Sequence, residues 1–376
     1  MYIREVGIAS PLGLGKVTSV QGFLRGSSGL SSNPIPMDGL PQSIAGVVPG
    51  FNPRKQLPDR KAVKLMSREA QLLVYAAVEA CGGTSPEEAL GVDAERIGGF
   101  AAAGYEVTPL DDVLDMFRQS RDQEDPSRLS TAQLFAHGRS AYNPLSPLKT
   151  LPNMALFHAA VTLGLRGPHL AVGSSPAAGL AALSGALDSM ADDACEYAVV
   201  GGADAQLELY RLHYLQECGV LEGSAPGEGA AALLVGPVGD VRIAAIGLGQ
   251  EPPAGPVPRE AYSVVGDRGA RRAALYSDVL QRATQSGAPP VDTVLADLWG
   301  LPARDAAERS ALGPLTTRAS LLETRSRVGH LGAAHGVFDV ALAAELIRGG
   351  AASSVLVTAG GVAGDLGAVV LCGATS

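Results

Sequence analysis

The sequence predicts an α/β fold in which most strands are parallel and buried. Short runs of β-branched and aliphatic residues alternate with alanine-rich runs along the chain, a pattern typical of strands connected by helices. Two strand-like segments also recur: residues 3–9 resemble residues 241–247, and residues 197–202 resemble residues 355–361. Because the two echoes have the same order in both parts of the chain, the sequence indicates an internal duplication.

The echoes divide the chain into two halves, residues 1–238 and 239–376, which we expect to form one compact structural unit. Aliphatic runs predict strands, at residues 2–8, 97–102, 197–200, 231–235, 241–246, 291–296, 354–358 and 368–372. Alanine-rich runs predict helices, at residues 17–25, 67–81, 155–163, 177–191, 270–285 and 337–348. Proline and glycine predict a loop over residues 249–259, and the polar stretch 108–143 is expected to cross the surface or a partner interface.

The chain carries few charges for its size. Of its 376 residues, 46% are hydrophobic and only 18% are charged, which is below the usual quarter. A protein with so little charge must bury much of its surface, so we expect a large core together with an extensive subunit interface. The formal net charge of −9 argues against nucleic acid and anionic membrane as partners.

Cofactor sites and export signals are not predicted. The four cysteines (Cys81, Cys195, Cys218 and Cys372) are far apart and form no CxxC motif, so we expect buried thiols rather than a metal site or disulfide framework. No phosphate-binding glycine motif is present, and we expect no metal, nucleotide or other cofactor. The amino terminus has no signal-like region, and no apolar run approaches the roughly 18 residues of a membrane span. A cytoplasmic protein is therefore expected.

Residues 167–180 place a proline at a chemically important position. They run from Gly167-Pro168 through a short strand into Ser174-Ser175-Pro176 and a helix. This segment resembles the nucleophile region of β-ketoacyl synthases, where Gly-Pro leads into Thr-Ala-Cys-Ser-Ser, and an ungapped count puts the family's cysteine at Pro176. Proline has no side-chain nucleophile and no N–H, so Pro176 can neither form a thioester nor donate its amide to an oxyanion.

Pro176 also suits a helix start. Ser174 or Ser175 can cap the first amides of the helix predicted at 177–191. Proline is favoured at the first helical position because its missing N–H would be unpaired there in any case. A purely structural role for the proline is therefore expected.

Four further segments carry the same resemblance in the same order. The family's opening strand and loop resemble residues 7–15, and the helix end that follows resembles residues 23–30. Its approach to the nucleophile resembles residues 148–155, and the strand after the nucleophile helix resembles residues 199–204. The chain is identified as a ketosynthase-like member of the thiolase superfamily, similar to chain-length factors over nearly its whole length. The resemblance implies a thiolase fold: two pseudo-twofold-related βαβαβαββ halves in a five-layer αβαβα sandwich.

The other catalytic positions of the family are also altered. The first catalytic histidine corresponds to Asp297, where an ionised carboxylate would repel the enolate that the histidine stabilises. The Lys-Ser-x-x-Gly-His motif corresponds to residues 325–330, so its lysine is Arg325 and its histidine is His330. We expect Arg325 to pair with Glu308 or another buried carboxylate. His330 is expected to be a hydrogen-bonded core residue or a donor to a pantetheine carbonyl.

Two loops depart from the family pattern as well. Only residues 221–226 remain where the family has its Pro-Phe-Asp and Arg-Asp-Gly-Phe elements, and the Gly-Phe-Gly-Gly gate corresponds to residues 361–364, with Val362 in place of phenylalanine. All of these changes fall on chemistry, whereas scaffold glycines and strands are retained. Chain-length factors resemble this chain in that selective loss.

The resemblance therefore implies a pseudoenzyme with no catalytic residues of its own. It would pair with an active ketosynthase as a heterodimer and shape the tunnel, with Val362 at its gate, for polyketide or fatty-acyl chains carried by an acyl carrier protein. Aromatic-polyketide members place glutamine at the cysteine position, so proline favours another pathway, such as a polyene system. The strand at 167–173 would pair with its counterpart across the dimer axis.

Two other functions stay open at this point. Ser175 as nucleophile, with Asp297 and His330, would make the chain a stand-alone acyltransferase or hydrolase. A homodimeric scaffold without enzymatic activity is the second. A basic run, Arg60, Lys61, Lys64 and Arg68, is predicted on neighbouring turns of one helix, where it would face solvent or dock an acidic carrier protein.

Overall fold

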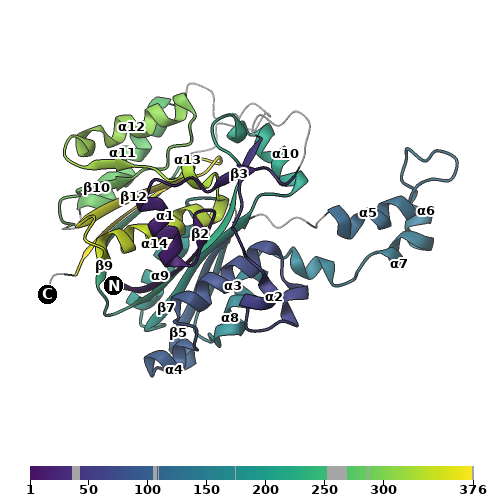
Figure 1. The fold of residues 1–376 in the computed structure, drawn as a ribbon, viewed down its shortest axis with the longest axis horizontal. Helices are drawn as coiled ribbons and strands as arrows, with labels where there is room; N and C mark the ends of the chain where they lie inside the picture. The colour runs from purple at the N-terminus through teal and green to yellow at the C-terminus, as the bar shows by residue number, and fades with distance from the viewer. Residues whose placement is uncertain are drawn as a thin grey trace.

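An 11-stranded sheet runs through the molecule in the computed structural model, which describes residues 1–35, 43–104, 108, 110–173, 175–251, 269–285 and 288–374 (Figure 1). The strands of its first part are β1 (Tyr2–Ser10), β5 (Ile97–Ala103), β6 (His169–Gly173), β7 (Tyr197–Ala205) and β8 (Glu228–Gly236). Those of its second part are β9 (Val241–Gln250), β10 (Thr293–Leu295), β11 (Ser320–Leu322), β12 (Ser354–Gly360) and β13 (Asp365–Gly373). The short β2 (Gly13–Leu14) pairs with β1, and β3 (Leu30–Ser32) and β4 (Ile44–Gly46) form a separate ribbon.

Both parts of the sheet have the same strand order. If the five long strands of each part are numbered in chain order, both parts have the spatial order 3-2-4-5-1. The first strands of the two parts, β1 and β9, pair with each other, with Tyr2 opposite Arg242 and Ile3 opposite Val241. The two sequence similarities fall on equivalent strands: the first is between β1 and β9, and the second is between β7 and β12. The outermost strands, β6 and β11, each pair on one side among the described residues.

The sheet is mixed, so the prediction of mostly parallel strands is wrong. β5 pairs in parallel with β6 and β7, and β10 does so with β11 and β12, whereas β8 and β13 pair antiparallel with both of their neighbours. Only residues 361–364 separate β12 from β13. A connection this short cannot return the chain for parallel pairing.

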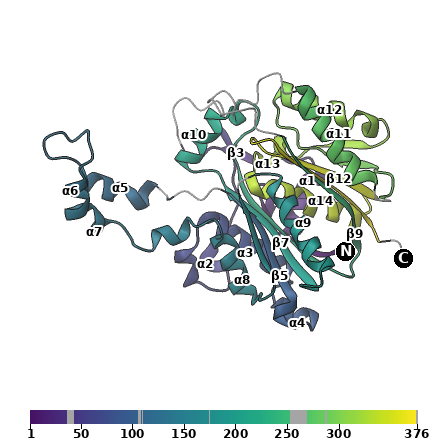
Figure 2. The ribbon, with the colours of Figure 1, turned by 180° about the vertical axis from the view of Figure 1, so that it is seen from behind.

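Helices cover the sheet in three layers (Figures 1 and 2). α3 (Arg68–Ala80) and α8 (Met154–Leu163) pack outside the first part, and α11 (Gly269–Gln285) packs with α12 (Pro302–Thr316) outside the second. Between the two parts, α9 (Ala178–Ala191) and α14 (His335–Arg348) contact strands of both. The five-layer αβαβα arrangement expected from the sequence is confirmed.

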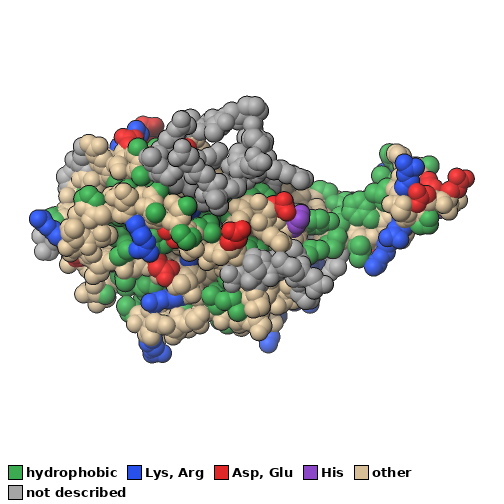
Figure 3. Space-filling view, turned by 90° about the horizontal axis from the view of Figure 1, so that it is seen from above, with side chains coloured by type: hydrophobic (Ala, Val, Ile, Leu, Met, Phe, Trp, Pro, Cys, Tyr) green, Lys and Arg blue, Asp and Glu red, His purple; other side chains and the backbone are tan. Residues whose placement is uncertain are grey.

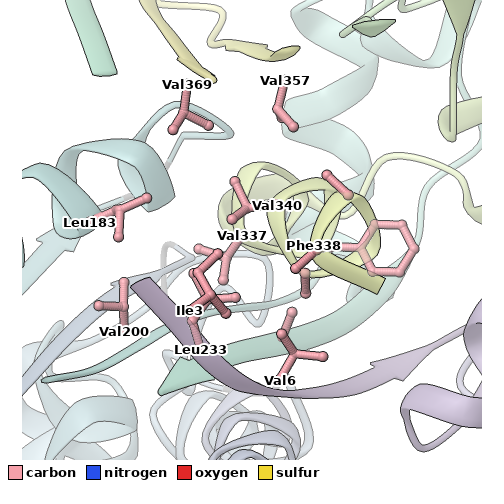
Figure 4. Packing of buried hydrophobic residues seen from close by; sticks show 14 of the residues in the cluster. Ile3, Val6, Leu183, Val200, Leu233, Val337, Phe338, Val340, Val357 and Val369 are labelled. Carbon is pink, nitrogen blue, oxygen red and sulfur yellow. The ribbon is translucent and has the colours of Figure 1, made fainter. Parts of the chain in front are cut away.

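The largest core cluster surrounds α14 (Figure 4), where Val337, Phe338 and Val340 pack against strand residues such as Ile3 and Val369. α9 crosses α14 closely at Gly179, because a Cβ there would lie 2.6 Å from Cγ2 of Val337. The crossing places the start of each central helix beside the other. The segment around Pro176 therefore lies against α14.

The remaining helices are short or peripheral, and several were not predicted. They are α1 (Lys16–Leu24), α2 (Pro53–Gln56), α4 (Pro86–Leu90), α5 (Leu110–Gln119), α6 (Thr131–Gln133), α7 (Arg139–Ala141), α10 (Leu209–Glu217) and α13 (Arg325–Val328). The polar stretch 108–143 contains α5 to α7 and projects from the body (Figure 1). The predictions missed α12 and β11. The loop predicted at 249–259 begins within β9, and its residues 252–259 lie outside the described residues.

Candidate functional site

Pro176 lies in the turn between β6 and α9. The structure begins α9 at Ala178 with Ala177 as its N-cap, one residue later than predicted, so Pro176 precedes the helix instead of occupying its first turn. Oγ of Ser175 accepts a hydrogen bond from the Ala177 amide at 3.0 Å, a turn contact before the helix rather than a cap within it. The alternative cap, Ser174, lies outside the described residues.

The backbone of this turn is fixed against α14. A Cβ at Gly336 would lie 2.4 Å from the carbonyl oxygen of Pro176, so the close approach needs glycine. The Ser175 hydroxyl also donates to Oδ2 of Asp365, at the start of β13. Ser175 is thus held by a carboxylate and a backbone amide, and its partner Asp365 was not predicted because it is 190 residues away in the sequence.

Asp297 follows β10 and is wholly buried between two arginines. Its Oδ1 accepts from Nε of Arg325 at 2.9 Å, and its Oδ2 accepts from Nη2 of Arg304 at 2.9 Å. Oδ2 also accepts from the Gly360 amide at 2.7 Å and from Nε1 of Trp299 at 3.0 Å. Burial by itself would raise the pKa of Asp297, but the charges of Arg325 and Arg304 more than offset it and lower that pKa.

Trp299, the single tryptophan of the chain, fills the space between the two guanidinium groups. Their central carbons lie 4.1 Å (Arg304) and 4.6 Å (Arg325) from a Trp299 ring centroid, and the His330 ring centroid lies at 4.9 Å. Cation–π contacts are strongest when both groups are desolvated, and Trp299 is only 1% exposed. We name these residues (Asp297, Trp299, Arg304, Arg325 and His330) the arginine cluster.

His330 is a neutral acceptor in this cluster. Its Nδ1 faces Nη1 of Arg325 within hydrogen-bonding distance, and because a guanidinium can only donate, Nδ1 must accept and Nε2 carries the proton. Burial, followed by the charge of Arg325, holds the pKa of His330 well below its ordinary value. The expectation of a hydrogen-bonded core histidine is met. Arg325 pairs with a buried carboxylate, as expected, and of the candidates that carboxylate is Asp297 and not Glu308.

Glu308 supports the cluster from α12. Its Oε1 accepts from the Asp297 amide at 3.0 Å and from Oγ1 of Thr358 at 2.5 Å, and its Oε2 accepts from the Tyr276 hydroxyl at 3.2 Å. Arg304 is within 3.7 Å of the same carboxylate. Burial, reinforced by the negative charge of Asp297, raises the pKa of Glu308. The sequence analysis named Glu308 as a candidate partner of Arg325 and gave no signal for Arg304.

Ser175, Asp297 and His330 are not assembled as a catalytic group. Within the described residues, no hydrogen bond joins any two of them: Ser175 binds Asp365, whereas Asp297 and His330 both bind Arg325. A serine needs an adjacent base for attack, and neutral His330, only 4% exposed, is committed to the arginine. The arrangement offers Ser175 a carboxylate but no imidazole.

A pocket of about 590 Å³ opens beside Ser175. Most of its lining is apolar or small, contributed by Val172, Ala178, Ala181, Leu248, Val362 and Leu366. Val362, at the family's gate position, therefore faces open space on one side and packs against the cluster that contains Trp299 on the other. The pocket borders β6 through Val172 and Gly173, so it adjoins the edge of the sheet.

The basic run divides into two parts. Arg60, Lys61 and Lys64 are exposed on a 3₁₀ turn and the loop before it, but α3 begins separately at Arg68 with Ser67 as its N-cap. The prediction of one continuous helix is wrong, because the chain is extended at Met66. Arg68 forms two hydrogen bonds with the buried carboxylate of Glu228, at 2.9 and 2.6 Å, and so has a structural partner.

Other expectations concern cysteines, metals and membranes. All four cysteines are free and buried, as predicted. In the ranges that the structure describes, no group of three His, Cys, Asp or Glu side chains is arranged to hold a metal ion. No helix in the described part of the chain has both the length and the apolar character needed to cross a bilayer.

Comparisons with solved structures show the same fold. The ishigamide ketosynthase/chain length factor is 21% identical with a TM-score of 0.71, over 100% of this chain and 99% of that one. A β-ketoacyl synthase from Burkholderia phymatum STM815 is 16% identical with a TM-score of 0.74, over 100% and 99%. The AntDE:AntF complex, a type II PKS acyl-carrier protein with its ketosynthase bound to the hexaketide, gives 13% identity and a TM-score of 0.72, over 99% and 98%.

The family itself is given by the sequence. No curated protein sequence matches the chain, but the family profile described as Beta-ketoacyl synthase, N-terminal domain, matches residues 6–237. That range is well over half of the 376 residues and contains the second half of β1, β2 to β8, the Pro176 turn and α9. With the thiolase fold of the whole chain, the match shows that this protein belongs to the β-ketoacyl synthase family.

Proposed function

We propose that the chain is a non-catalytic, chain-length-factor-like subunit of a ketosynthase heterodimer. The observation that carries the proposal is the arginine cluster. Where the resemblance places the catalytic histidine and lysine, the chain has a closed ion pair of Asp297 with Arg325, and Trp299 fills the adjoining space. Together with Pro176 at the nucleophile position, these residues leave the family's catalytic positions without a nucleophile for an acyl-enzyme and without a hydrogen-bond donor for an enolate.

The preserved scaffold supports a role in pairing. β6 is an edge strand whose residues are mostly exposed, and a ketosynthase could extend the sheet by pairing with it. An exposed edge of this kind is a template for another strand. The solved relative named as a ketosynthase/chain length factor is the reason to choose a ketosynthase partner. Under this proposal residues 1–238 and 239–376 are duplicate halves of one cytoplasmic unit.

The apolar pocket beside Ser175 is assigned to the wall of the chain tunnel. Because it borders Val172 and Gly173 of β6, it would open onto the subunit interface once β6 is paired. A growing polyketide or fatty-acyl chain is largely apolar and suits such a lining. Polyene intermediates have the same apolar character and are the product class that we favour.

An exposed basic surface is assigned to the acyl carrier protein. Arg54, Lys55, Arg60, Lys61 and Lys64 are all exposed, and Asp59, the acidic residue among them, uses its carboxylate to accept from the amides of Lys61 and Ala62. A surface of one sign steers a partner of the opposite sign. Charge reversal in a Lys61→Glu, Lys64→Glu variant should weaken binding of an acidic carrier protein and leave pairing with the ketosynthase unchanged.

The decisive experiment is reconstitution. The chain is co-expressed with each Cys-His-His ketosynthase of the same genome, and the complex is isolated and supplied with malonyl carrier protein. We expect one ketosynthase to co-purify in equal amounts and to elongate only in the complex. A folded chain that pairs with none of them, or that elongates alone, would contradict the proposal.

The tunnel assignment has its own test. Ala181→Phe, inside the pocket, should shorten the product without changing heterodimer formation. Ala194→Phe is the matched control, because Ala194 is exposed beyond the end of α9. Equal product lengths for wild type and Ala181→Phe would show that the pocket is not part of the tunnel.

A further inference from the structure

The arm, residues 110–145, projects from the body of the molecule (Figures 1 and 2). Its helices α5, α6 and α7 pack on one another through the π-helical turn Leu134–Gly138. Among the arm residues whose burial is described, only Ser120 and Gly138 are buried. These two meet, since a Cβ at Gly138 would lie 2.1 Å from Oγ of Ser120. The arm thus has a defined internal crossing but no core.

Large apolar side chains of the arm face solvent in the isolated chain. The exposed fractions are 60% for Leu129, 64% for Phe135, 47% for Leu145 and 38% for Phe117. A segment that buries so little cannot offset the entropy of ordering it. Phe117 and Leu129 line one hollow, and exposed apolar surface of this kind marks an interaction site, so we expect another surface to cover the arm.

The apolar surface of the arm continues toward the edge of the sheet. Leu148 and Leu151 follow at the root of the arm, Phe157 and Val161 on α8, and Leu170 on β6, and all five are exposed. In Figure 3 hydrophobic side chains extend from the body along the stem of the arm. These exposed apolar residues therefore extend from the arm to β6, the strand that pairs with the ketosynthase in the proposed function. The ketosynthase is thus the candidate to cover both the arm and β6.

The arm also carries a hollow with positive charge at its rim. Its volume is about 370 Å³, and it is lined by Leu114, Phe117, Arg118, Arg121, Pro126, Ser127, Arg128 and Leu129. Arg118 binds Asp115 at 3.1 Å, but no carboxylate of a described residue pairs with Arg121 or Arg128. The nearby Asp122 and Asp125 carboxylates accept instead from backbone amides at 2.9 to 3.1 Å. Such a hollow fits an apolar side chain flanked by carboxylates.

We propose that the arm is a clasp that closes over the ketosynthase subunit and receives an apolar side chain with neighbouring carboxylates in the hollow at Arg121 and Arg128. This inference rests on the proposed function for the identity of the partner. It adds a second contact region, separate from β6, that a ketosynthase of another pathway would have to match. The arm would then select the partner as well as bind it.

The test compares dissociation constants of the heterodimer by surface plasmon resonance with the ketosynthase immobilised. Leu129→Asp and Phe135→Asp should each weaken binding at least about tenfold, because charge is placed in a desolvated contact. Leu24→Asp is the matched control: Leu24 is 58% exposed on α1, away from the arm, and its replacement should leave binding unchanged. Arg121→Glu with Arg128→Glu should mainly slow association and reduce its dependence on salt.

Thermal unfolding of each chain alone shows that the variants fold, since the replaced side chains are exposed. If the wild type binds a ketosynthase and the arm variants bind equally well, the clasp is wrong while the proposed function stands. If the wild type binds no ketosynthase, the proposed function itself fails. If the arm variants change only self-association or carrier-protein binding, the occupant is a second copy or the carrier protein, and the inference is overturned.

Discussion

Arg325 donates from Nε to Oδ1 of Asp297 at 2.9 Å, and both side chains are at most 2% exposed. Arg304 donates to the other oxygen of the same carboxylate. An ion pair this deep is expensive to separate, because either partner left alone is an uncompensated buried charge. Under the proposed function the altered positions are more than lost catalysts, because Asp297 and Arg325 form a buried ion pair with a structural role of its own.

Removing one member of the pair should strongly destabilise the chain. Asp297→Asn leaves two buried guanidinium groups without their carboxylate, so we expect the free energy of unfolding to fall by about 3–5 kcal/mol. Urea unfolding followed by the fluorescence of Trp299 measures it, because that ring contacts both arginines. The control is Asp193→Asn in the exposed pair with Arg96, where the expected loss is about 0–1 kcal/mol. Equal losses at the two sites would contradict the buried-pair argument.

A second buried group predicts acid sensitivity. Nε2 of His335 lies 3.0 Å from Oγ1 of Thr324 and 3.5 Å from Oδ2 of Asp339. Burial, followed by the charge of Arg325, lowers the pKa of His335 well below its ordinary value. As pH falls below about 6.5 the unfolded chain takes up this proton before the folded one, so stability decreases by about 1.4 kcal/mol per pH unit in that window.

Two neighbours modify this pH dependence. The lowered pKa of His330 acts in the same sense, whereas burial raises the pKa of Asp339 well above its ordinary value and acts in the opposite sense. In His335→Gln, the free energy of unfolding should therefore fall less steeply between about pH 6.5 and 5, by about 1.4 kcal/mol per pH unit, because one group fewer takes up a proton on unfolding. Urea unfolding at several pH values measures the slope, with the exposed His213→Gln as control. An unchanged slope in His335→Gln would mean that His335 is charged in the folded state.

Restoring the nucleophile alone should not restore chemistry. Pro176→Cys returns a thiol to the turn, but Asp297 still occupies the position of the enolate's donor and is negatively charged through its lowered pKa. We expect no decarboxylation of malonyl carrier protein by this variant, measured by release of labelled carbon dioxide, with an active ketosynthase as positive control. Turnover by Pro176→Cys would show that the cluster does not prevent catalysis. A stable acyl adduct on Ser175 of the wild type, absent in Ser175→Ala, would restore the acyltransferase alternative.

The fold could be predicted from sequence because its signals are local or repeated. The echo of residues 3–9 at 241–247 identified equivalent strands, and Gly167-Pro168 fixed the register of Pro176 in the family. α12 was missed because Arg304 and Glu308, two charged residues one helical turn apart, are buried in ion pairs. Charged residues that pair inside a protein carry no periodic apolar signal.

The contacts of the site could not be predicted for a different reason. Ser175 meets Asp365, and Arg304 meets Tyr276 of α11, through the tertiary packing of segments far apart in the chain. No spacing rule links such pairs. The sequence identified Asp297, Arg325 and His330 through the family resemblance. It gave no signal that Trp299 and Arg304 would also bind Asp297.

The exposed strand β6 gives the last prediction. β6 pairs only with β5 among the described residues, and Ala171, at its centre, is exposed. If a partner strand continues the sheet there, the interface should exceed about 2,000 Å² and be obligate. Ala171→Asp would then place an unpaired charge in a desolvated seam and cost several kcal/mol of association, whereas Ala171→Thr, uncharged and favoured in strands, should still pair.

Size-exclusion chromatography with light scattering decides this, on the chain alone and with its ketosynthase. We expect Ala171→Thr to elute as the complex and Ala171→Asp to separate from its partner while keeping the melting temperature of the isolated wild-type chain, because the replaced side chain is exposed in that chain. Retention of the full complex by Ala171→Asp would place the interface elsewhere. A well-folded wild-type monomer at micromolar concentration in the presence of the ketosynthase would remove the basis for a heterodimer altogether.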